Sequence, residues 1–593
     1  MLKLFKHLKS KEWTMVAISV AFIVCQVWLD LRLPDYMSEI TRLVQTPGSA
    51  MADIWKSGGS MVLCALGSLA SAIAVGYIAS RIGASFSQRL RTLLFNKVES
   101  FSMEEINRFS TASLITRSTN DVTQVQMLIV MALQVVIKAP ITAVWAITKI
   151  AGKGFEWSMV TASCVVIICI MVTILMIFVM PKFRMMQTLT DNITRETREN
   201  LTGLRVVRAY NAEGYQEAKF EKANDELTGT QLYTIRAMVM MMPVMQLMMS
   251  GMSLAIYWIG AYLIDGASMA MAASGVPEKL EIFSNMVVFM NYSMQVIMSF
   301  MMLVMIFVML PRAAVSAKRI YEVLETEAKI IDGDATQGLP GAVGHIEFRN
   351  VSFKYPDAAD YILEDISFTA KEGETVAFIG ATGSGKSTLI NLIPRFFDAS
   401  DGEVLVDGVN VKDYKLESLL NKIGYVPQKA VLFMGTVDSN VAYGDNGTEG
   451  YSEDDVRKAV HIAQGADFVE NMEDGYYAAV SQGGANLSGG QKQRLAIARA
   501  ICRKPEIYIF DDSFSALDYK TDRALRSELK RETSGVTSLI VAQRIGTIME
   551  ADRIIVLDEG KIVGIGRHKE LMQDCAVYRE IALSQLSEEE LAS

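Results

Sequence analysis

Six apolar segments dominate the first half of the chain and limit what it can form there. They cover about residues 13–33, 61–79, 127–150, 158–180, 239–264 and 286–310. A helix of roughly 20 apolar residues crosses the hydrocarbon core of a bilayer, and each segment is close to that length. Hydrophobic residues make up 51% of the 593 residues, and the apolar excess lies almost wholly before about Pro311. The sequence therefore predicts a membrane-spanning α-helical bundle followed by a soluble half.

The connections between these segments differ in length and charge. The outer connections, 34–60, 151–157 and 265–285, are the shorter ones, whereas 80–126 and 181–238 are long, charged and helical in pattern. Both long connections are rich in Lys and Arg, and four lysines precede the first span. The positive-inside rule places these parts in the cytoplasm, and six spans place the C-terminal half there too.

Residues 380–388 read Gly-Ala-Thr-Gly-Ser-Gly-Lys-Ser-Thr and fit the pattern G-x-x-x-x-G-K-[ST]. The apolar run before them predicts a buried strand, and the residues after them predict the start of a helix. The glycines let backbone N–H groups turn toward phosphate, the lysine supplies a mobile positive charge, and a hydroxyl supplies a ligand for Mg²⁺. The motif predicts a site for a nucleoside triphosphate and Mg²⁺ made by Gly380, Thr382, Gly383, Ser384, Gly385, Lys386, Ser387 and Thr388.

Composition argues against several other classes of protein. The net charge is −9, and no basic face with interleaved aromatics is evident, so nucleic acid is not an expected partner. The six cysteines contain no C-x-x-C pair, and the four histidines are scattered. We therefore expect buried, unreactive cysteines and no zinc-type metal site.

The order of these parts resembles the ABC exporters, in which six helices with two long intracellular hairpins precede an α/β P-loop nucleotide-binding domain that binds ATP. Phe109–Asp121 is similar to the first intracellular loop of the family, and Glu199–Tyr210 is similar to the second. The family places a short coupling helix in each loop, here near Ser110–Arg117 and Leu204–Asn211. The resemblance implies a transmembrane domain at 1–330, a linker at 331–344 and a nucleotide-binding domain at 345–593.

Further motifs of the family follow in order. Tyr355 stands where the family has an aromatic residue that stacks on adenine, and Gln428 stands in a segment that resembles the Q-loop, which reaches Mg²⁺ and water. Leu487-Ser-Gly-Gly-Gln491 resembles the ABC signature, so Ser488, Gly489, Gly490 and Gln491 are expected to face the γ-phosphate held by another subunit. Asp518 ends a segment that resembles the D-loop.

Two positions depart from the family pattern. Ile507–Asp512 resembles the Walker B strand, in which Asp511 should hold Mg²⁺ through water, but Asp512 stands where active members have a glutamate that acts as general base. Gln543 likewise replaces the switch histidine. Aspartate is one methylene shorter than glutamate, and a base withdrawn from the reacting water loses much of its effect. Glutamine can donate a hydrogen bond but has no imidazole protonation states.

This asymmetry resembles one subunit of the bacterial heterodimeric multidrug ABC exporters. The resemblance implies export of hydrophobic or amphipathic, drug-like compounds across the cytoplasmic membrane, with a second half-transporter as partner. This chain would build the slow ATP site, and its signature would complete the site of the partner. Two alternatives stay open: a homodimeric lipid or drug exporter that tolerates Asp512, and an ATP-gated regulatory or channel-like subunit.

Several residues inside the spans invite a functional interpretation. Lys138 lies within the third span, where it either marks a functional site or reaches the inner interface by snorkelling, and we favour the second interpretation. Asp30 and Arg32 at the outer end of the first span either pair or lie in the headgroup zone. Methionines recur at three- and four-residue spacing in the sixth span, at 286, 290, 294, 298, 301 and 305, which predicts one thioether-lined helix face.

Overall fold

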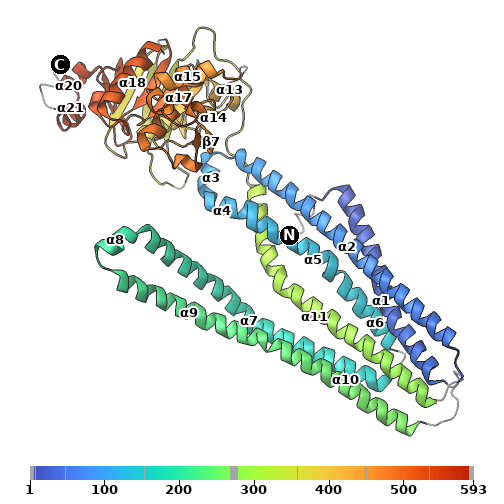
Figure 1. The fold of residues 1–593 in the computed structure, drawn as a ribbon. Coiled ribbons are helices and arrows are strands. Elements are labelled where there is room, and N and C mark those ends of the chain that lie inside the picture. Colours follow the sequence, from blue (N-terminus) through green and yellow to red (C-terminus); the bar gives the residue numbers. More distant parts are fainter. Residues whose placement is uncertain are drawn as a thin grey trace. The chain divides into compact units, whose positions relative to one another are not determined.

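The computed structural model divides the chain into two compact units (Figure 1). The helical unit comprises Met1–Val98 and Ala112–Thr326, and the sheet unit comprises Glu99–Thr111 and Glu327–Ser593. The residues described are 6, 8–46, 48–151, 154–267, 278–356, 358–445, 447, 450–532 and 535–586, with no account of the side chains at 184, 304–309, 311 and 312.

Long helices make up the helical unit. They are α1 (Ser10–Gln45), α2 (Met51–Glu99), the run α4–α6 (Thr111–Ile150), α7 (Phe155–Thr202), α9 (Glu213–Val239) with α10 (Met241–Gly266), and α11 (Glu278–Glu325). Six of these helices and helical runs are long and apolar enough to cross a membrane, which agrees with the predicted fold class. Leu63, Leu66 and Ile73 of α2 are more than half exposed, as expected for a surface that lipid covers.

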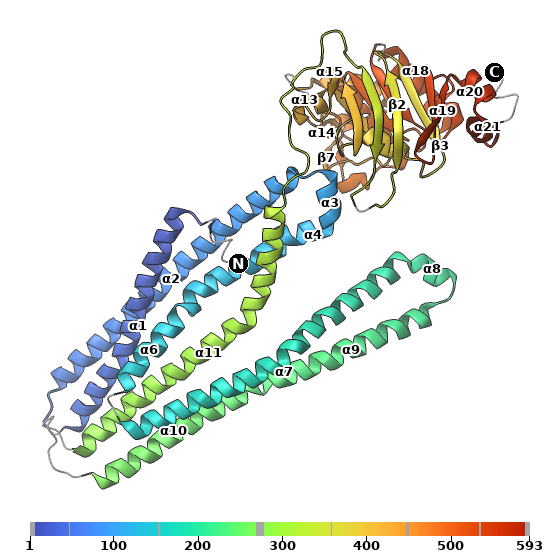
Figure 2. The same ribbon diagram turned by 180° about the vertical axis from the view of Figure 1, so that it is seen from behind.

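Helices α1, α6 (Lys138–Ile150) and α11 pack against one another around an apolar core, which contains Ile23, Val27, Leu31, Ala146, Phe289 and Tyr292. Helices α7 and α9 pair along their length, and the short helix α8 (Leu204–Ala209) forms the tip of their hairpin (Figure 2). The second predicted coupling helix therefore lies where the sequence placed it.

The first coupling helix lies earlier than expected. The short helix of that loop is α3 (Met103–Phe109), whereas residues 111–116 already form α4, the start of the third long helical run. A capping box between Ser102 and Glu105 starts α3, and Ser110 ends it with a left-handed backbone (φ 57°). Glu105 also accepts a bond from the Lys329 backbone N–H at 3.2 Å, which ties α3 to the sheet unit.

The structure decides between the expectations for the charged residues of the spans. Lys138 Nζ lies 3.3 Å from Asp30 Oδ2, so it bridges α6 to α1 and does not snorkel inward. Asp30 is therefore not paired with Arg32, whose guanidinium lies 5.1 Å from the centroid of the Trp28 ring. Charged residues inside membrane spans commonly pair with one another, as Lys138 and Asp30 do here.

The methionine face of α11 is not uniform. Met286 is buried against Gly260, while Met290 and Met301 are half-buried in the apolar core. Met298 is 44% exposed, and the side chain at 305 lies outside the described residues. The methionines of the predicted face therefore range from buried to exposed, and whether this face lines a transport path stays a prediction.

Three sheets build the other unit (Figure 2). The strands are β1 (Ile346–Phe353), β2 (Leu363–Ala370), β3 (Thr375–Gly380), β4 (Asp401–Val406), β5 (Val409–Asn410), β6 (Ile423–Val426), β7 (Gly435–Thr436), β8 (Ala479–Val480), β9 (Ile507–Asp511), β10 (Thr537–Val541), β11 (Arg553–Asp558) and β12 (Lys561–Gly566). A six-stranded sheet has the order β12-β11-β3-β10-β9-β6, an antiparallel sheet has the order β2-β1-β4-β5, and β7 pairs with β8.

Helices cover these sheets. They are α12 (Lys386–Asn391), α13 (Leu416–Asn421), α14 (Val437–Val441), α15 (Glu453–Ile462), α16 (Ala466–Val469), α17 (Gly489–Cys502), α18 (Tyr519–Glu532), α19 (Ile545–Ile548), α20 (His568–Asp574) and α21 (Ala576–Leu583). Every residue of β9 and β10 is buried, as expected for parallel strands covered on both faces. Strands β3, β10, β9 and β6 are parallel, so their carboxyl ends meet at one edge of the sheet.

A buried ion cluster fastens the antiparallel sheet to this parallel one. Lys422 Nζ lies 2.8 Å from Asp407 Oδ2 and 2.8 Å from Glu506 Oε2. The Asp407 side chain is only 2% exposed, so it depends on Lys422 for its neutralisation. Removing one member of a buried ion pair leaves an uncompensated charge, which is strongly destabilising.

We therefore expect Lys422→Met to destabilise the chain by about 3 kcal/mol and to lower its unfolding temperature by several degrees. Lys415→Met is the matched control, because Lys415 pairs with Glu417 on the surface, where both side chains are at least half exposed. Its loss should change stability by less than about 0.5 kcal/mol. Thermal unfolding of the purified chain in detergent measures both, and equal shifts would contradict the structural role of the cluster.

Candidate nucleotide-binding and hydrolysis site

The glycine-rich loop lies between β3 and α12, at the carboxyl edge of the parallel sheet. A side chain at Gly380 would meet the backbone oxygen of Leu557 on β11, so only glycine lets β3 turn into the loop at this point. Gly383 and Gly385 have φ angles of 88° and 93°, in the left-handed region. A methyl group at Gly385 would also come within 2.7 Å of Leu363 Cδ2, whereas one at Gly383 would meet nothing within 4 Å.

Lys386 is held inside this loop. Its Nζ donates to the carbonyl oxygens of Gly380 and Ala381 at 2.9 and 2.8 Å, and it lies 3.3 Å from Ser384 Oγ. Burial lowers the pKa of Lys386, while the nearby carboxylates of Asp512 and Asp511 act in the opposite direction. The ammonium group is therefore poised among neutral oxygens, which a phosphate can replace as its partner.

Ser387 and Asp511 meet directly, because α12 and β9 approach each other at the same edge of the sheet. Ser387 Oγ donates to Asp511 Oδ1 at 2.7 Å, and burial raises the pKa of Asp511. A hydroxyl and a carboxylate are the hard oxygen ligands that Mg²⁺ prefers, so the pair fits a site for this ion. When bound, Mg²⁺ would neutralise phosphate charge, and these two side chains would hold it together with solvent.

Asp512 accepts hydrogen bonds from Gln428 and Gln543, the two glutamines that the sequence analysis singled out. Gln428 Nε2 donates to Asp512 Oδ2 at 3.2 Å, and Gln543 Nε2 donates to the same oxygen at 2.9 Å. The residue has a left-handed backbone (φ 45°), and its N–H donates to the Val541 carbonyl at 3.0 Å. Burial raises the pKa of Asp512. Gln428 thus contacts Asp512 in this structure, and the role of reaching Mg²⁺ and water, which the family resemblance implies for it, stays a prediction.

Tyr355 stands beside the loop in an aromatic cluster. Its hydroxyl lies 3.1 Å from Thr388 Oγ1 of α12, and its ring packs edge-on against Phe353 and Phe397. Tyr355 is half-buried, so these contacts fix its position while part of the ring stays accessible. The structure brings it to the loop, as a residue that stacks on a bound base must be.

The signature segment caps a helix at the surface. Ser488 Oγ accepts from the Gln491 N–H at 3.3 Å, and Gln491 Oε1 accepts from the Ser488 N–H at 2.8 Å, which is a capping box that starts α17. Ser488 and Gly489 are exposed. Asp518 is also exposed, and its carboxylate accepts from the Thr521 N–H at 3.0 Å at the start of α18.

Among the described residues, the contacts form one group around the glycine-rich loop and leave the signature outside it. Ser387, Asp511, Asp512, Gln428 and Gln543 lie together through hydrogen bonds and chain neighbours, and Lys386 lies in the same loop. No hydrogen bond within the described chain connects Ser488–Gln491 to that group. Within the described chain, the exposed signature is therefore separate from the glycine-rich loop.

Two supporting residues carried no sequence signal. Gln585 Nε2 donates to the Gln543 carbonyl at 2.7 Å, and Gln585 Oε1 accepts from the Ile545 N–H at 2.9 Å, so it braces the segment that carries Gln543. Gln493 of α17 is buried and lies 3.4 Å from the Pro427 carbonyl, just before Gln428. Both act through contacts between segments that are distant in sequence, and a lone glutamine in a helix pattern does not reveal them.

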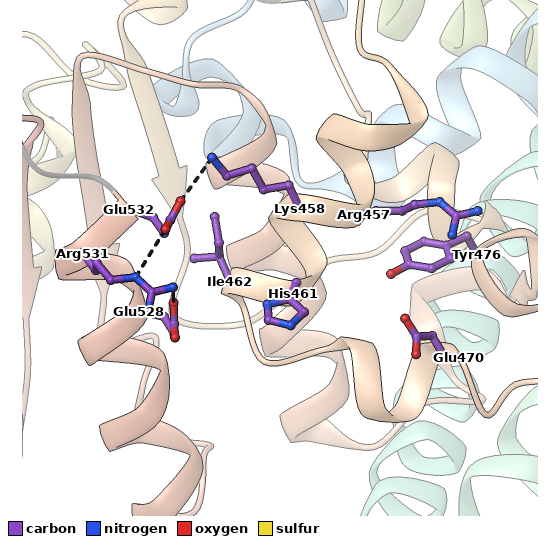
Figure 3. Close-up of a pocket in the computed structure, with 9 residues that line it drawn as sticks. All are labelled: Arg457, Lys458, His461, Ile462, Glu470, Tyr476, Glu528, Arg531 and Glu532. Atoms are coloured by element: carbon purple, nitrogen blue, oxygen red, sulfur yellow. Dashed lines mark hydrogen bonds and ion pairs between the residues drawn. The ribbon is translucent and has the colours of Figure 1, made fainter.

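A surface pocket of about 400 Å³ lies elsewhere in the sheet unit (Figure 3). It is lined by Arg457, Lys458, His461, Ile462, Glu470, Tyr476, Glu528, Arg531 and Glu532. Lys458 of α15 pairs with Glu532 of α18 at 3.1 Å, and Arg531 pairs with Glu528. None of the glycine-rich loop residues lines it, so this pocket is separate from the nucleotide site.

Comparisons with known proteins agree with this geometry. Residues 16–274 match the family described as ABC transporter transmembrane region, and residues 363–515 match that described as ABC transporter. An uncharacterized ABC transporter ATP-binding protein of Mycobacterium tuberculosis is 40% identical over 89% of this chain and 87% of its own length. The ATP-dependent lipid A-core flippase of Pseudomonas aeruginosa is 31% identical over 86% of this chain and 82% of its own.

A solved structure described as a bacterial Atm1-family ABC exporter with ATP bound has the same fold. The TM-score is 0.80 at 23% identity, and the likeness covers 97% of this chain and 99% of the other. At that identity the likeness concerns the fold alone.

The two loop glycines give a matched test of the nucleotide site. Both Gly383→Ala and Gly385→Ala force a side chain into the left-handed region, but only Gly385→Ala also drives a methyl group against Leu363. We expect Gly385→Ala to weaken ATP binding by at least about 10-fold, and Gly383→Ala to weaken it less. Titration of the purified chain with a fluorescent ATP analogue measures both, and an equal loss would show that contact with Leu363 does not shape the loop.

Proposed function

We propose, since this chain belongs to the ABC transporter family, that it is the subunit of a heterodimeric exporter that carries the slow ATP site. It is a multi-pass membrane protein with an ATP-binding domain of the ABC type. Closure of two such domains on ATP would be passed to the spans through α3 and α8. The bacterial cytoplasmic membrane is the proposed location, with the sheet unit in the cytoplasm.

The observation that carries the proposal is the contact of Gln428 and Gln543 with Asp512. A general base must accept a proton from water, and its reach and its free oxygen decide how well it does so. Asp512 is one methylene shorter than glutamate, and both amides donate to its Oδ2. This arrangement supports ATP occupancy with slow turnover at the site that this chain builds.

The exposed signature supports a partner subunit. Ser488–Gln491 presents backbone N–H groups at the start of the 14-residue helix α17, a favourable place for a phosphate group. In the proposed heterodimer this segment completes the fast site, whose loop, glutamate and histidine come from the other chain. The partner is thus a second half-transporter that retains both residues.

A hydrophobic or amphipathic compound is the proposed substrate. The spans expose apolar surface, and half-buried methionines adapt to varied apolar shapes. A second candidate function is homodimeric lipid export, which is favoured by the similarity to a lipid A-core flippase. In that case Asp512 would act as an adequate base in two identical sites.

Turnover by this chain alone separates the two candidates. We expect the purified chain to hydrolyse ATP at a rate at least about 10-fold below that of the double variant Asp512→Glu/Gln543→His, because the variant restores the reach of the base and the imidazole. The single variant Asp512→Glu is the control for reach alone. Brisk turnover by the unaltered chain would instead indicate a working homodimer.

With the purified partner subunit, the contributions of the two proposed ATP sites to turnover can be compared. We expect Asp512→Asn to change the ATP turnover of the heterodimer by less than about 2-fold, because the slow site contributes little. Ser488→Arg should lower it by at least about 100-fold, because a bulky side chain fills the place of the γ-phosphate at the fast site. Steady-state turnover with purified heterodimer measures both, and equal losses would contradict the asymmetry.

A further inference from the structure

Two lysine–aspartate pairs lie within the apolar helices of the helical unit, and the distances between their charged atoms differ. Lys149 Nζ lies 2.7 Å from Asp35 Oδ2, and the fully buried Tyr292 donates to Asp35 Oδ1 at 2.7 Å. Lys138 Nζ lies 3.3 Å from Asp30 Oδ2, beyond the usual 2.7–2.9 Å of a charge-assisted bond. The first pair is a tight link between α1, α6 and α11, and the second is a loose one.

The loose pair is partly exposed in apolar surroundings, as is the tight pair, whose Lys149 and Asp35 side chains are 36% and 28% exposed. The two pairs therefore differ in the length of the ion pair and not in exposure. The side chains of Lys138 and Asp30 are 24% and 27% exposed, while Val27 and Leu31 beside Asp30 belong to the buried core of the bundle. Ser68 of α2 also donates to Asp30, so three helices meet at this point. Among the described residues, Asp30 is the only carboxylate within ion-pair distance of Lys138.

The backbone before Lys138 is irregular, and this changes the position of its side chain around the helix. Residues 132–136 form a π-helix, closed by the Ile137 N–H donating to the Ala132 carbonyl at 3.2 Å. Pro140 has no N–H to offer the Val136 carbonyl, which favours the wider turn. One extra residue in a turn rotates the following side chains by about 100° around the helix. Such bulges occur often at functional sites.

We propose that Asp30 and Lys138 form a binding site for the zwitterionic head group of an amphiphile, a molecule with one ammonium and one phosphate or carboxylate group on an apolar tail. The inference rests on the proposed export function and names its substrate class. On binding, the Lys138 ammonium exchanges Asp30 for the anionic group, and Asp30 exchanges Lys138 for the ammonium of the ligand. Ser68 stays bonded to Asp30.

The charge balance of the site favours a zwitterionic ligand over a purely anionic or a purely cationic one. An unpaired charge is costly in an apolar setting. A purely anionic ligand would pair with Lys138 and leave Asp30 alone, and a purely cationic ligand would do the reverse. A zwitterion leaves neither side chain unpaired, so only the zwitterion can open the pair without stranding a charge.

Head-group preference in direct binding tests the proposal. The probes are three lipids with the same acyl chains and a phosphocholine, a phosphoglycerol or a trimethylammonium head, bound to the purified full-length chain and counted by native mass spectrometry. We expect the phosphocholine lipid to bind at least about 5-fold more tightly than either of the others. Equal binding of all three would overturn the proposal.

Charge-neutral variants show whether these two residues cause the preference. Lys138→Met leaves Asp30 alone and should shift the preference to the cationic lipid, whereas Asp30→Asn should shift it to the anionic lipid. The double variant Asp30→Asn/Lys138→Met strands no charge, so it should fold and lose the preference. If the double variant keeps the preference of the unaltered chain, the proposal fails.

Two controls test whether the preference belongs to this pair of residues. Lys149→Met removes the tight pair and should leave the head-group preference unchanged, although it lowers stability. Binding is measured without ATP, so it stands even if the slow-site assignment fails in turnover assays. A single-chain alkylphosphocholine that competes with the phosphocholine lipid would indicate zwitterionic amphiphiles in general, and absence of competition would restrict the class to two-chain lipids.

Discussion

The parallel register of β3, β10, β9 and β6 is the constraint on which the nucleotide site depends. Because these strands run in one direction, their carboxyl ends bring the glycine-rich loop, Asp511, Asp512 and Gln428 to one edge of the sheet. The close approach of Gly380 to Leu557 fixes the loop at that edge. The Ser387–Asp511 bond then joins α12 to β9 and sets the spacing of the oxygen ligands.

The ion pairs of the two units differ in how closely their charged groups approach each other. In the sheet unit, Lys422, Asp407 and Glu506 form a cluster around the buried Asp407 in which each charge has a close partner. In the helical unit, Lys149 and Asp35 are similarly close, but Lys138 and Asp30 are further apart, and the side chains of both pairs are partly exposed. A longer ion pair is more easily replaced by ion pairs to a ligand than a shorter one is.

The glutamines around Asp512 support the proposed slow site by a feature other than side-chain length. Aspartate is one methylene shorter than glutamate, so the carboxylate reaches less far. The side-chain amides of Gln428 and Gln543 also both donate to its Oδ2. Gln585 in turn holds the segment of Gln543 at two backbone groups. Because both bonds are to backbone groups, a substitution at position 543 leaves this bracing in place.

Local sequence was enough to predict the six spans and the strand–loop–helix motif, and the family resemblance predicted the second coupling helix and identified the departures at 512 and 543. These features depend on hydrophobic runs, glycine spacing and residue identity, which neighbours along the chain express directly. The sequence placed the first coupling helix at 110–117, because it did not weigh the cap of Ser102 and Glu105. Only the tertiary structure paired Lys138 with Asp30, brought Gln585 to Gln543 and set Gln428 against Asp512. Those contacts join segments from 42 to 108 residues apart, and no local pattern encodes a bond whose partners meet only when helices and sheets pack.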